Sequence, residues 1–204
     1  MDKDASQHLE NLIYLDLLEE RGVELKISKR GEQFESYSAV SKQMSSVLLK
    51  WYNLAILDLT TCSNFRSDPG WIAKQFGISV EEVKEALRLL VDLGLLEKTK
   101  GSFKKTTLKI RFPASESMMN FIRKYHMEMI GRAAKTLERT SKEDFERRLI
   151  TGITVAANPM QFAKARKRLN EALHEVADLL AEGECTEVYQ INAQLFPLTQ
   201  TLED

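Results

Sequence analysis

The chain has 204 residues, of which 43% are hydrophobic, and a formal net charge of −1 at pH 7. This apolar content is ordinary for a globular protein and excludes a largely disordered chain. The balanced charge excludes a whole-protein field that attracts nucleic acid, so such attraction would require a local basic patch.

The cysteine usage, the lack of long apolar runs and the N-terminal segment together predict a soluble, cytoplasmic protein. Cys62 and Cys185 are far apart in the sequence and form no Cys-x-x-Cys pair, which is typical of a reducing compartment and predicts neither a metal nor a redox site. No run of 18 apolar residues occurs, and the N-terminal MDKDASQHLE is too polar and acidic for a signal peptide. We therefore expect no membrane partner.

The first 62 residues predict a small N-terminal unit and then a long helix. A helix is expected over 5–21 and two short strands over 23–38, so residues 1–40 are assigned to an N-terminal helix and short hairpin. Apolar residues then recur at helical spacing over 41–62, which predicts one continuous helix.

Residues 68–111 carry the strongest pattern in the chain. Asp68 and Pro69 predict the start of a short helix that stops at Gly77. Ser79 and Glu82 are spaced as a capping box for a second helix over 79–93, and residues 95–111 fit a β-hairpin with its tip near 100–102. This order is typical of a winged helix-turn-helix, to which we assign residues 41–112.

The remaining chain, 116–204, predicts a C-terminal module. A long helix is expected over 116–139, strands over 149–157 and 186–196, and a helix from Asn158 to about 181 between them. The predicted fold class is therefore α+β and mostly helical, with a winged helix-turn-helix joined to a C-terminal β-α-β module and its small sheet. Two strands make a poor sheet alone, so a third strand would come from residues 23–38 or from another copy of the chain.

The helix over 79–93 occupies the position of a DNA-recognition helix, yet it is acidic. Residues 79–94 contain four acids and two bases. Glu81, Glu82 and Glu85 would be repelled by phosphates, whereas the helix dipole favours them in the first turns. The groove-facing candidates that remain are Ser79, Lys84 and Arg88.

The predicted hairpin is basic, with six cations and no acid between Lys98 and Arg111. Such a wing could neutralise about three or four backbone phosphates without reading the bases. The alternative is a solvated hairpin whose lysines prevent pairing between edges. Together with the helix, the candidate nucleic-acid-binding residues are Ser79, Lys84, Arg88, Lys98, Lys100, Lys104 and Lys105.

A second basic cluster opens the helix over 158–181, where the helix dipole disfavours cations. The cluster could meet acidic residues of another protomer, or it could be a solvated face; it consists of Lys164, Arg166, Lys167 and Arg168. The same helix carries an a/d seam of under three heptads, too short to define a coiled coil, formed by Phe162, Ala165, Leu169, Ala172, Val176 and Leu179.

Nothing in the sequence predicts an enzyme. The three histidines are scattered, and no nucleophile elbow, phosphate-binding loop, dinucleotide fingerprint or zinc-protease motif occurs. We expect no catalytic residue, metal or cofactor. An enzyme or a small-molecule sensor is the third alternative, which a ligand found in a polar cavity beside Gln190, Asn192 and Gln194 would favour.

Several strings together resemble a known family: WYNLAILDL, DPGWIAKQFGIS, LGLL, YHMEM and the closing VYQINAQLFPLT, which cover roughly residues 45–200. They are similar to a bacterial family of conserved hypothetical proteins with a domain of unknown function, expanded in predatory delta-type proteobacteria. The resemblance implies a winged-helix fold and the presumed role of a transcription regulator. Longer members begin with a Cro-like helix-turn-helix, of which residues 1–44 show no sign.

Two functional hypotheses follow. The first is a non-enzymatic, homodimeric regulatory protein that touches duplex DNA through its basic wing. The second is an adaptor that binds a protein partner with a winged helix that no longer binds DNA. Topology alone does not decide between them.

Overall fold

The computed structural model describes residues 45–106 and 116–200, which form a mostly helical α+β fold. In chain order the elements are α3 (Tyr52–Leu59), α4 (Pro69–Phe76), α5 (Val80–Asp92), β1 (Leu96–Thr99), β2 (Ser102–Lys105), α6 (Glu116–Thr136), α7 (Lys142–Glu146), the 3-10 helix η1 (Pro159–Gln161) and α8 (Phe162–Leu180). The predicted fold class is confirmed at this level. The helix and hairpin predicted within residues 1–40 lie outside the described residues, and the division into three domains stays a prediction.

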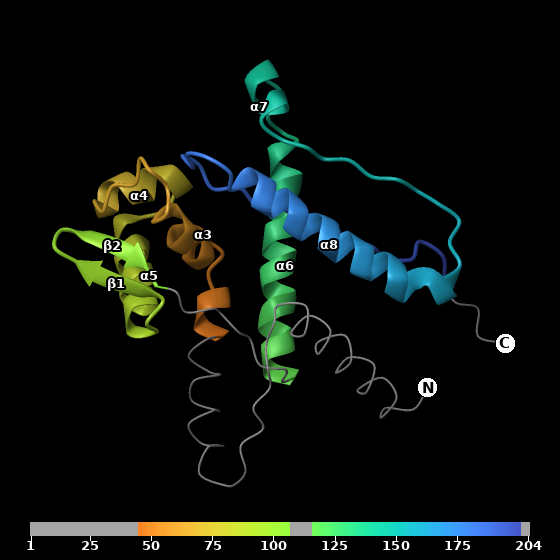
Figure 1. The fold of residues 1–204 in the computed structure, drawn as a ribbon, viewed down its shortest axis with the longest axis horizontal. Helices are drawn as coiled ribbons and strands as arrows, with labels where there is room; N and C mark the ends of the chain where they lie inside the picture. The colour runs from red at the N-terminus through yellow and green to blue at the C-terminus, as the bar shows by residue number, and fades with distance from the viewer. Residues whose placement is uncertain (1–44, 107–115, 201–204) are drawn as a thin grey trace, which may run out of the picture.

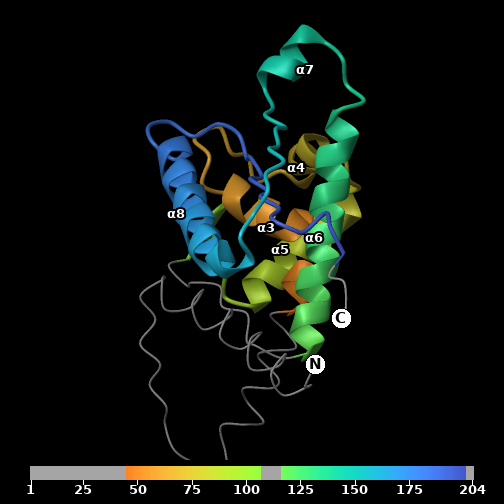
Figure 2. The ribbon, with the colours of Figure 1, turned by 90° about the vertical axis from the view of Figure 1, so that its right-hand side faces the viewer.

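Helices α3 to α5 and the hairpin form one group beside the long helix α6 (Figure 1). Helix α7 lies at the far end of α6. Helix α8 crosses α6 in that view, but the turned view separates the two helices, with the extended chain and the C-terminal tail between them (Figure 2). None of the described helices combines the length and the apolar character needed to cross a membrane.

The buried core belongs to the group of α3, α4, α5 and β1. Each helix contributes one apolar face, and Leu95 and Leu96 enter from the start of the hairpin. The side chains that are essentially inaccessible include Ile56, Ile72, Val83, Leu90 and Leu95. Burying such side chains stabilises the fold by roughly 1.5–3 kcal/mol each before the loss of chain entropy is counted.

The predicted ends of α4 and α5 are confirmed. The Asp68 carboxylate accepts a hydrogen bond from the backbone amide of Trp71 at 2.7 Å, and Pro69 occupies the first helical turn. Gly77 ends α4 in the left-handed region with φ 63°, a conformation that costs a residue with a Cβ. Ser79 and Glu82 form the capping box of α5, and Gly94, with φ 69°, follows that helix.

The long helix predicted over 41–62 is wrong as a continuous element. Within the described residues it is a helical turn at 45–48, a break at 49–51 and then α3. The buried side-chain amide of Asn53 donates hydrogen bonds to the backbone carbonyls of Val47 at 3.1 Å and Ser46 at 3.4 Å. The Ser46 carbonyl also accepts from the Leu49 amide at 3.2 Å, so the Asn53 side chain supplements a tight turn where a straight helix would use backbone amides four residues on.

The hairpin forms as predicted, with β1 and β2 antiparallel and Lys100 and Gly101 at its tip. Its register pairs Leu96 with Lys105, Glu97 with Lys104, Lys98 with Phe103 and Thr99 with Ser102. Gly101 adopts φ 87°, which a tight two-residue turn requires.

The two strands predicted in the C-terminal module are wrong for the single chain. Residues 149–158 and 186–197 are extended but pair with no strand in the described part of the chain. A strand requires a neighbouring ladder, and the candidate third strand at 23–38 falls outside the described residues. The intervening helix is confirmed, and the Asn158 side chain caps its 3-10 start by accepting from the amide of Met160.

The C-terminal tail after α8 contacts both the α3–α5 core and helix α6. The Ser63 amide donates to the Cys185 carbonyl at 2.9 Å, and Val188 packs on the core. The side-chain amide of Asn192 donates to the Met129 carbonyl of α6 at 3.3 Å. The tail therefore connects the loop after α3 to α6.

Most apolar side chains of the C-terminal half face solvent. Among the described side chains from 118 to 200, Met118 and Met129 are the buried hydrophobic ones. Large apolar side chains are exposed on the extended segment and on α8, including Ile153, Val155, Val176, Leu179 and Leu180. Large contiguous patches of exposed apolar side chains are typical of interaction surfaces.

Candidate nucleic-acid interface

The N-terminus of α5 is occupied by its own capping groups. The Glu82 carboxylate accepts hydrogen bonds from the Ser79 amide at 2.9 Å and hydroxyl at 2.8 Å, while the Glu82 amide donates to the Ser79 hydroxyl at 3.2 Å. The backbone and side-chain donors of Ser79 hold the pKa of the Glu82 carboxyl below its usual value. Ser79 is therefore committed to stabilising the helix.

One of the two α5 cations is also engaged. The Lys84 ammonium lies 2.7 Å from the Glu81 carboxylate, and both side chains are exposed. Arg88, one turn further on, is exposed and forms no ion pair with a described carboxylate. Because an exposed pair contributes little stability, Lys84 can exchange Glu81 for another anion at small cost.

The four candidate lysines of the hairpin fall into two groups. Lys105 forms an ion pair with Asp58 of α3 at 2.5 Å, and Lys104 lies directly across the ladder from Glu97. Lys98 and Lys100 are exposed and pair with no carboxylate among the residues that the structure describes. The predicted Lys109 and Arg111 of the wing lie outside the described residues.

The hairpin tip is held by the loop before α4. The Ser67 hydroxyl donates a hydrogen bond to the Gly101 carbonyl at 2.6 Å. This contact brings the exposed Arg66 to the same end of the hairpin as Lys100. Arg66 was not among the residues predicted from the sequence, because nothing in the local pattern links it to a hairpin more than 30 residues away.

The structure thus gathers part of the predicted set. Lys98, Lys100 and Lys104 share the hairpin, joined at its tip by Arg66, while Lys105 turns toward α3. Ser79, Lys84 and Arg88 lie on α5, whose first turns also present Glu81 and Glu85 to solvent. The resulting surface is a small cationic tip beside an anionic helix, suited to holding an anion at the tip alone.

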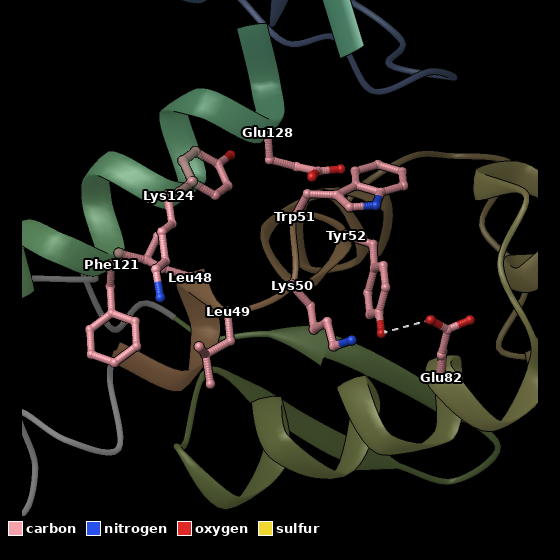
Figure 3. A pocket seen from close by; sticks show the side chains of 10 residues that line it. Leu48, Leu49, Lys50, Trp51, Tyr52, Glu82, Phe121, Lys124 and Glu128 are labelled. Carbon is pink, nitrogen blue, oxygen red and sulfur yellow. Dashed lines mark hydrogen bonds between the residues drawn. The ribbon is translucent and has the colours of Figure 1, made fainter. Parts of the chain in front are cut away.

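A pocket of about 340 Å³ opens between the start of α3 and α6, and no hairpin residue lines it (Figure 3). Tyr52 points across it and donates a hydrogen bond to Glu82 at 3.4 Å. Trp51 stacks under the Arg132 guanidinium, whose central carbon lies 3.2 Å from the ring centroid. These contacts join α3, α5 and α6; the pocket is lined by Leu48, Leu49, Lys50, Trp51, Tyr52, Glu82, Phe121, Lys124, Tyr125 and Glu128.

The buried Tyr52 predicts a loss of stability in alkali. Burial, and secondly the neighbouring Glu82 carboxylate, raise the pKa of Tyr52 from 10 to about 12. The unfolded chain therefore releases this proton first, and the Tyr52 contribution, complete below pH 10, is lost as the pH rises toward 12. From pH 9 to 11 the free energy of unfolding should fall by about 1 kcal/mol more in the wild type than in Tyr52→Phe. Urea titrations followed by tryptophan fluorescence would measure this, and equal losses would contradict it.

These observations define a mostly helical α+β protein with a short hairpin whose tip is cationic. The chain belongs to the family described as Domain of unknown function (DUF4423), whose model matches residues 31–198. The match confirms the expected membership of a family of unknown function. Neither the curated proteins nor the solved structures gave a match. The regulator role and the bacterial lineage implied by the resemblance stay predictions.

Proposed function

We propose that the chain is a non-enzymatic regulatory protein whose residues 52–105 act as a winged helix that contacts duplex DNA through its hairpin. The order of α3, α4, α5 and hairpin supports the winged-helix assignment. The observation that carries the proposal is the exposed pair Lys98 and Lys100 at the hairpin tip, free of described carboxylates and joined by Arg66.

The geometry favours contact with phosphates over reading of bases. The carboxylates of Glu81 and Glu85 keep the first turns of α5 away from a polyanion. The lysines of the hairpin bind phosphate oxygens as point charges, which positions a protein on DNA without giving sequence specificity. Sequence-specific binding to an operator would therefore need base contacts from elsewhere, such as another domain or a partner protein.

The proposal predicts weak, salt-sensitive binding. About three phosphate contacts imply that the Kd rises roughly 40-fold between 50 and 200 mM monovalent salt, because each contact releases condensed counterions. Removing two contacts in Lys98→Ala/Lys100→Ala should weaken binding at low salt and reduce this rise to about 3-fold. Fluorescence anisotropy of a labelled duplex, titrated at both salt concentrations, measures both effects.

The matched control removes the same charge elsewhere. Lys135→Ala/Lys142→Ala takes two exposed lysines from the end of α6 and from α7, distant from the hairpin in sequence, and should leave the salt dependence as in the wild type. Binding that does not respond to salt, or an equal loss in both double variants, would contradict contact through the hairpin.

A protein-interaction adaptor is the second candidate, and the ion pairs of the surface favour it. Lys84 and Lys105 are already matched with Glu81 and Asp58, and Glu97 faces Lys104. If these acids limit DNA binding, Glu97→Gln should strengthen it several-fold at low salt. The adaptor would be supported if neither the wild type nor Glu97→Gln binds DNA and if a pull-down recovers one defined protein partner.

We further propose that the protein acts as a homodimer in the cytoplasm. The large apolar side chains exposed on α8 and on the extended segments support an association between copies. Two cysteines without a disulfide, Cys62 and Cys185, support a reducing compartment.

A further inference from the structure

Helix α8 presents an apolar stripe that is only partly covered in the described structure, since Leu169 and Leu173 are half-buried and its other large side chains are exposed. It contains no buried residue, and its main neighbour among the described elements is η1. The stripe is formed by the a and d positions of the predicted seam, widened by Leu173 and Leu180 on the same face. Val176 is 45% exposed and Leu179 is 64% exposed. A 19-residue amphipathic helix normally buries such a stripe against another element.

Beside the apolar stripe runs a charged one with a change of sign. Residues spaced by four, three, four, three and four along α8 and its end form one line, in the order Lys164, Arg168, Glu171, Glu175, Asp178 and Glu182. The first two are cations and the last four are anions. Arg168 and Glu171 form an ion pair within the helix at 3.2 Å, but the order as a whole opposes the helix dipole, which prefers anions at the N-terminus and cations at the C-terminus.

We infer that α8 is the self-association surface of the homodimer and pairs with α8 of a second copy in antiparallel orientation. A two-fold axis near the middle of the helix places the cationic half of each α8 against the anionic half of its partner. A parallel pair would set like charges against each other, which is unfavourable. The same antiparallel arrangement brings Arg168 close to Glu175 of the second copy.

The apolar side chains also fit this arrangement. With the axis near residues 170 and 171, Leu169 of one helix faces Ala172 of the other, and Ala165 faces Val176. In these two pairs a large side chain meets a small one, which allows close packing, whereas the outer pair of the seam sets Phe162 against Leu179. A stable interface buries about 800 Å² on each partner. The extended segments that flank α8 can add apolar area, since Ile153, Val155 and Leu195 are exposed.

Charge reversal in one half of the helix tests the inference. Lys164→Glu/Arg168→Glu makes the stripe wholly anionic, and Glu175→Lys/Asp178→Lys makes it mainly cationic. Each variant should dimerise at least about tenfold more weakly than the wild type by sedimentation equilibrium, because like charges now face each other. Both changes place charges where the helix dipole favours them, so weaker association would not reflect loss of α8. Circular dichroism checks the helix content.

Mixing the two variants supplies the decisive measurement. An anionic α8 and a cationic α8 should form a heterodimer with about the affinity of the wild-type homodimer, detected by capture through a tag on one variant. Failure of the mixture to associate would overturn the antiparallel pairing. This inference rests on the proposed homodimer. If the wild type dimerises and neither charge reversal weakens the dimer, α8 is not its surface. If the wild type is a monomer at tens of micromolar, both the homodimer and the α8 surface are overturned.

Discussion

Replacing Asn53 with aspartate is expected to cost about 3–5 kcal/mol of the free energy of unfolding at pH 7. Asn53 is 2% exposed, and its amide nitrogen donates to the carbonyls of Val47 and Ser46. An aspartate would direct carboxylate oxygens at carbonyl oxygens in a site that excludes water. Two repulsive contacts would replace two hydrogen bonds, and the buried charge would have no partner.

The pH dependence distinguishes this mechanism from simple loss of packing. Burial beside carbonyls must raise the pKa of an aspartate at position 53 above its unfolded value of about 3.9. The folded variant then binds the proton more tightly than the unfolded chain does, so its penalty shrinks as the pH falls from 7 toward 4. The control Asn53→Ala removes the donor without adding charge. Its free energy of unfolding should fall by about 1–3 kcal/mol, and this loss should be similar at each pH. A pH-independent penalty for the aspartate variant would contradict this explanation.

Truncation of Leu90 to alanine is expected to destabilise the protein by about 3–4 kcal/mol. Leu90 is fully buried on α5, and its carbonyl accepts from the Leu95 amide where the chain turns into the hairpin. The substitution removes contacts with the surrounding core and leaves a cavity that rigid neighbours cannot close. Because a domain is stable by only about 5–15 kcal/mol, the loss is a large fraction of the total.

Tryptophan fluorescence during urea unfolding is suited to this test. Both tryptophans of the chain, Trp51 and Trp71, pack against the same core as Leu90. The control Leu137→Ala removes an exposed leucine just after α6 and should change the free energy of unfolding by less than about 0.5 kcal/mol. Equal effects of the two substitutions would show that this core does not govern stability.

The elements that the sequence predicted best are those set by local chemistry. Asp68, Gly77 and the pair Ser79 and Glu82 determine where α4 and α5 begin and end through contacts within four residues. The break before α3 could not be predicted, because an asparagine inside a helical pattern carries no signal that its side chain will bind carbonyls six and seven residues earlier. The C-terminal strands failed for another reason: alternation predicts a strand only where a neighbour is available.

The sequence predicted which lysines the candidate site contains, but not which of them are paired with carboxylates. The sequence places Lys98, Lys100, Lys104 and Lys105 together because they lie in one hairpin. It does not show that Asp58, 47 residues before Lys105, neutralises that lysine. Nor does it show that the register sets Glu97 against Lys104. Pairings across the chain depend on tertiary packing and strand register, which a linear count of acids and bases does not contain.

The hydrogen bond from Ser67 to Gly101 has a consequence for how the hairpin meets any ligand. A ribbon of two four-residue strands, attached only at its base, would sample many orientations, and binding would have to select one of them. Anchored at both ends, the ribbon loses that freedom during folding. Its ammonium groups are then presented in a single orientation, and the entropy that association must overcome falls mainly on the lysine side chains themselves.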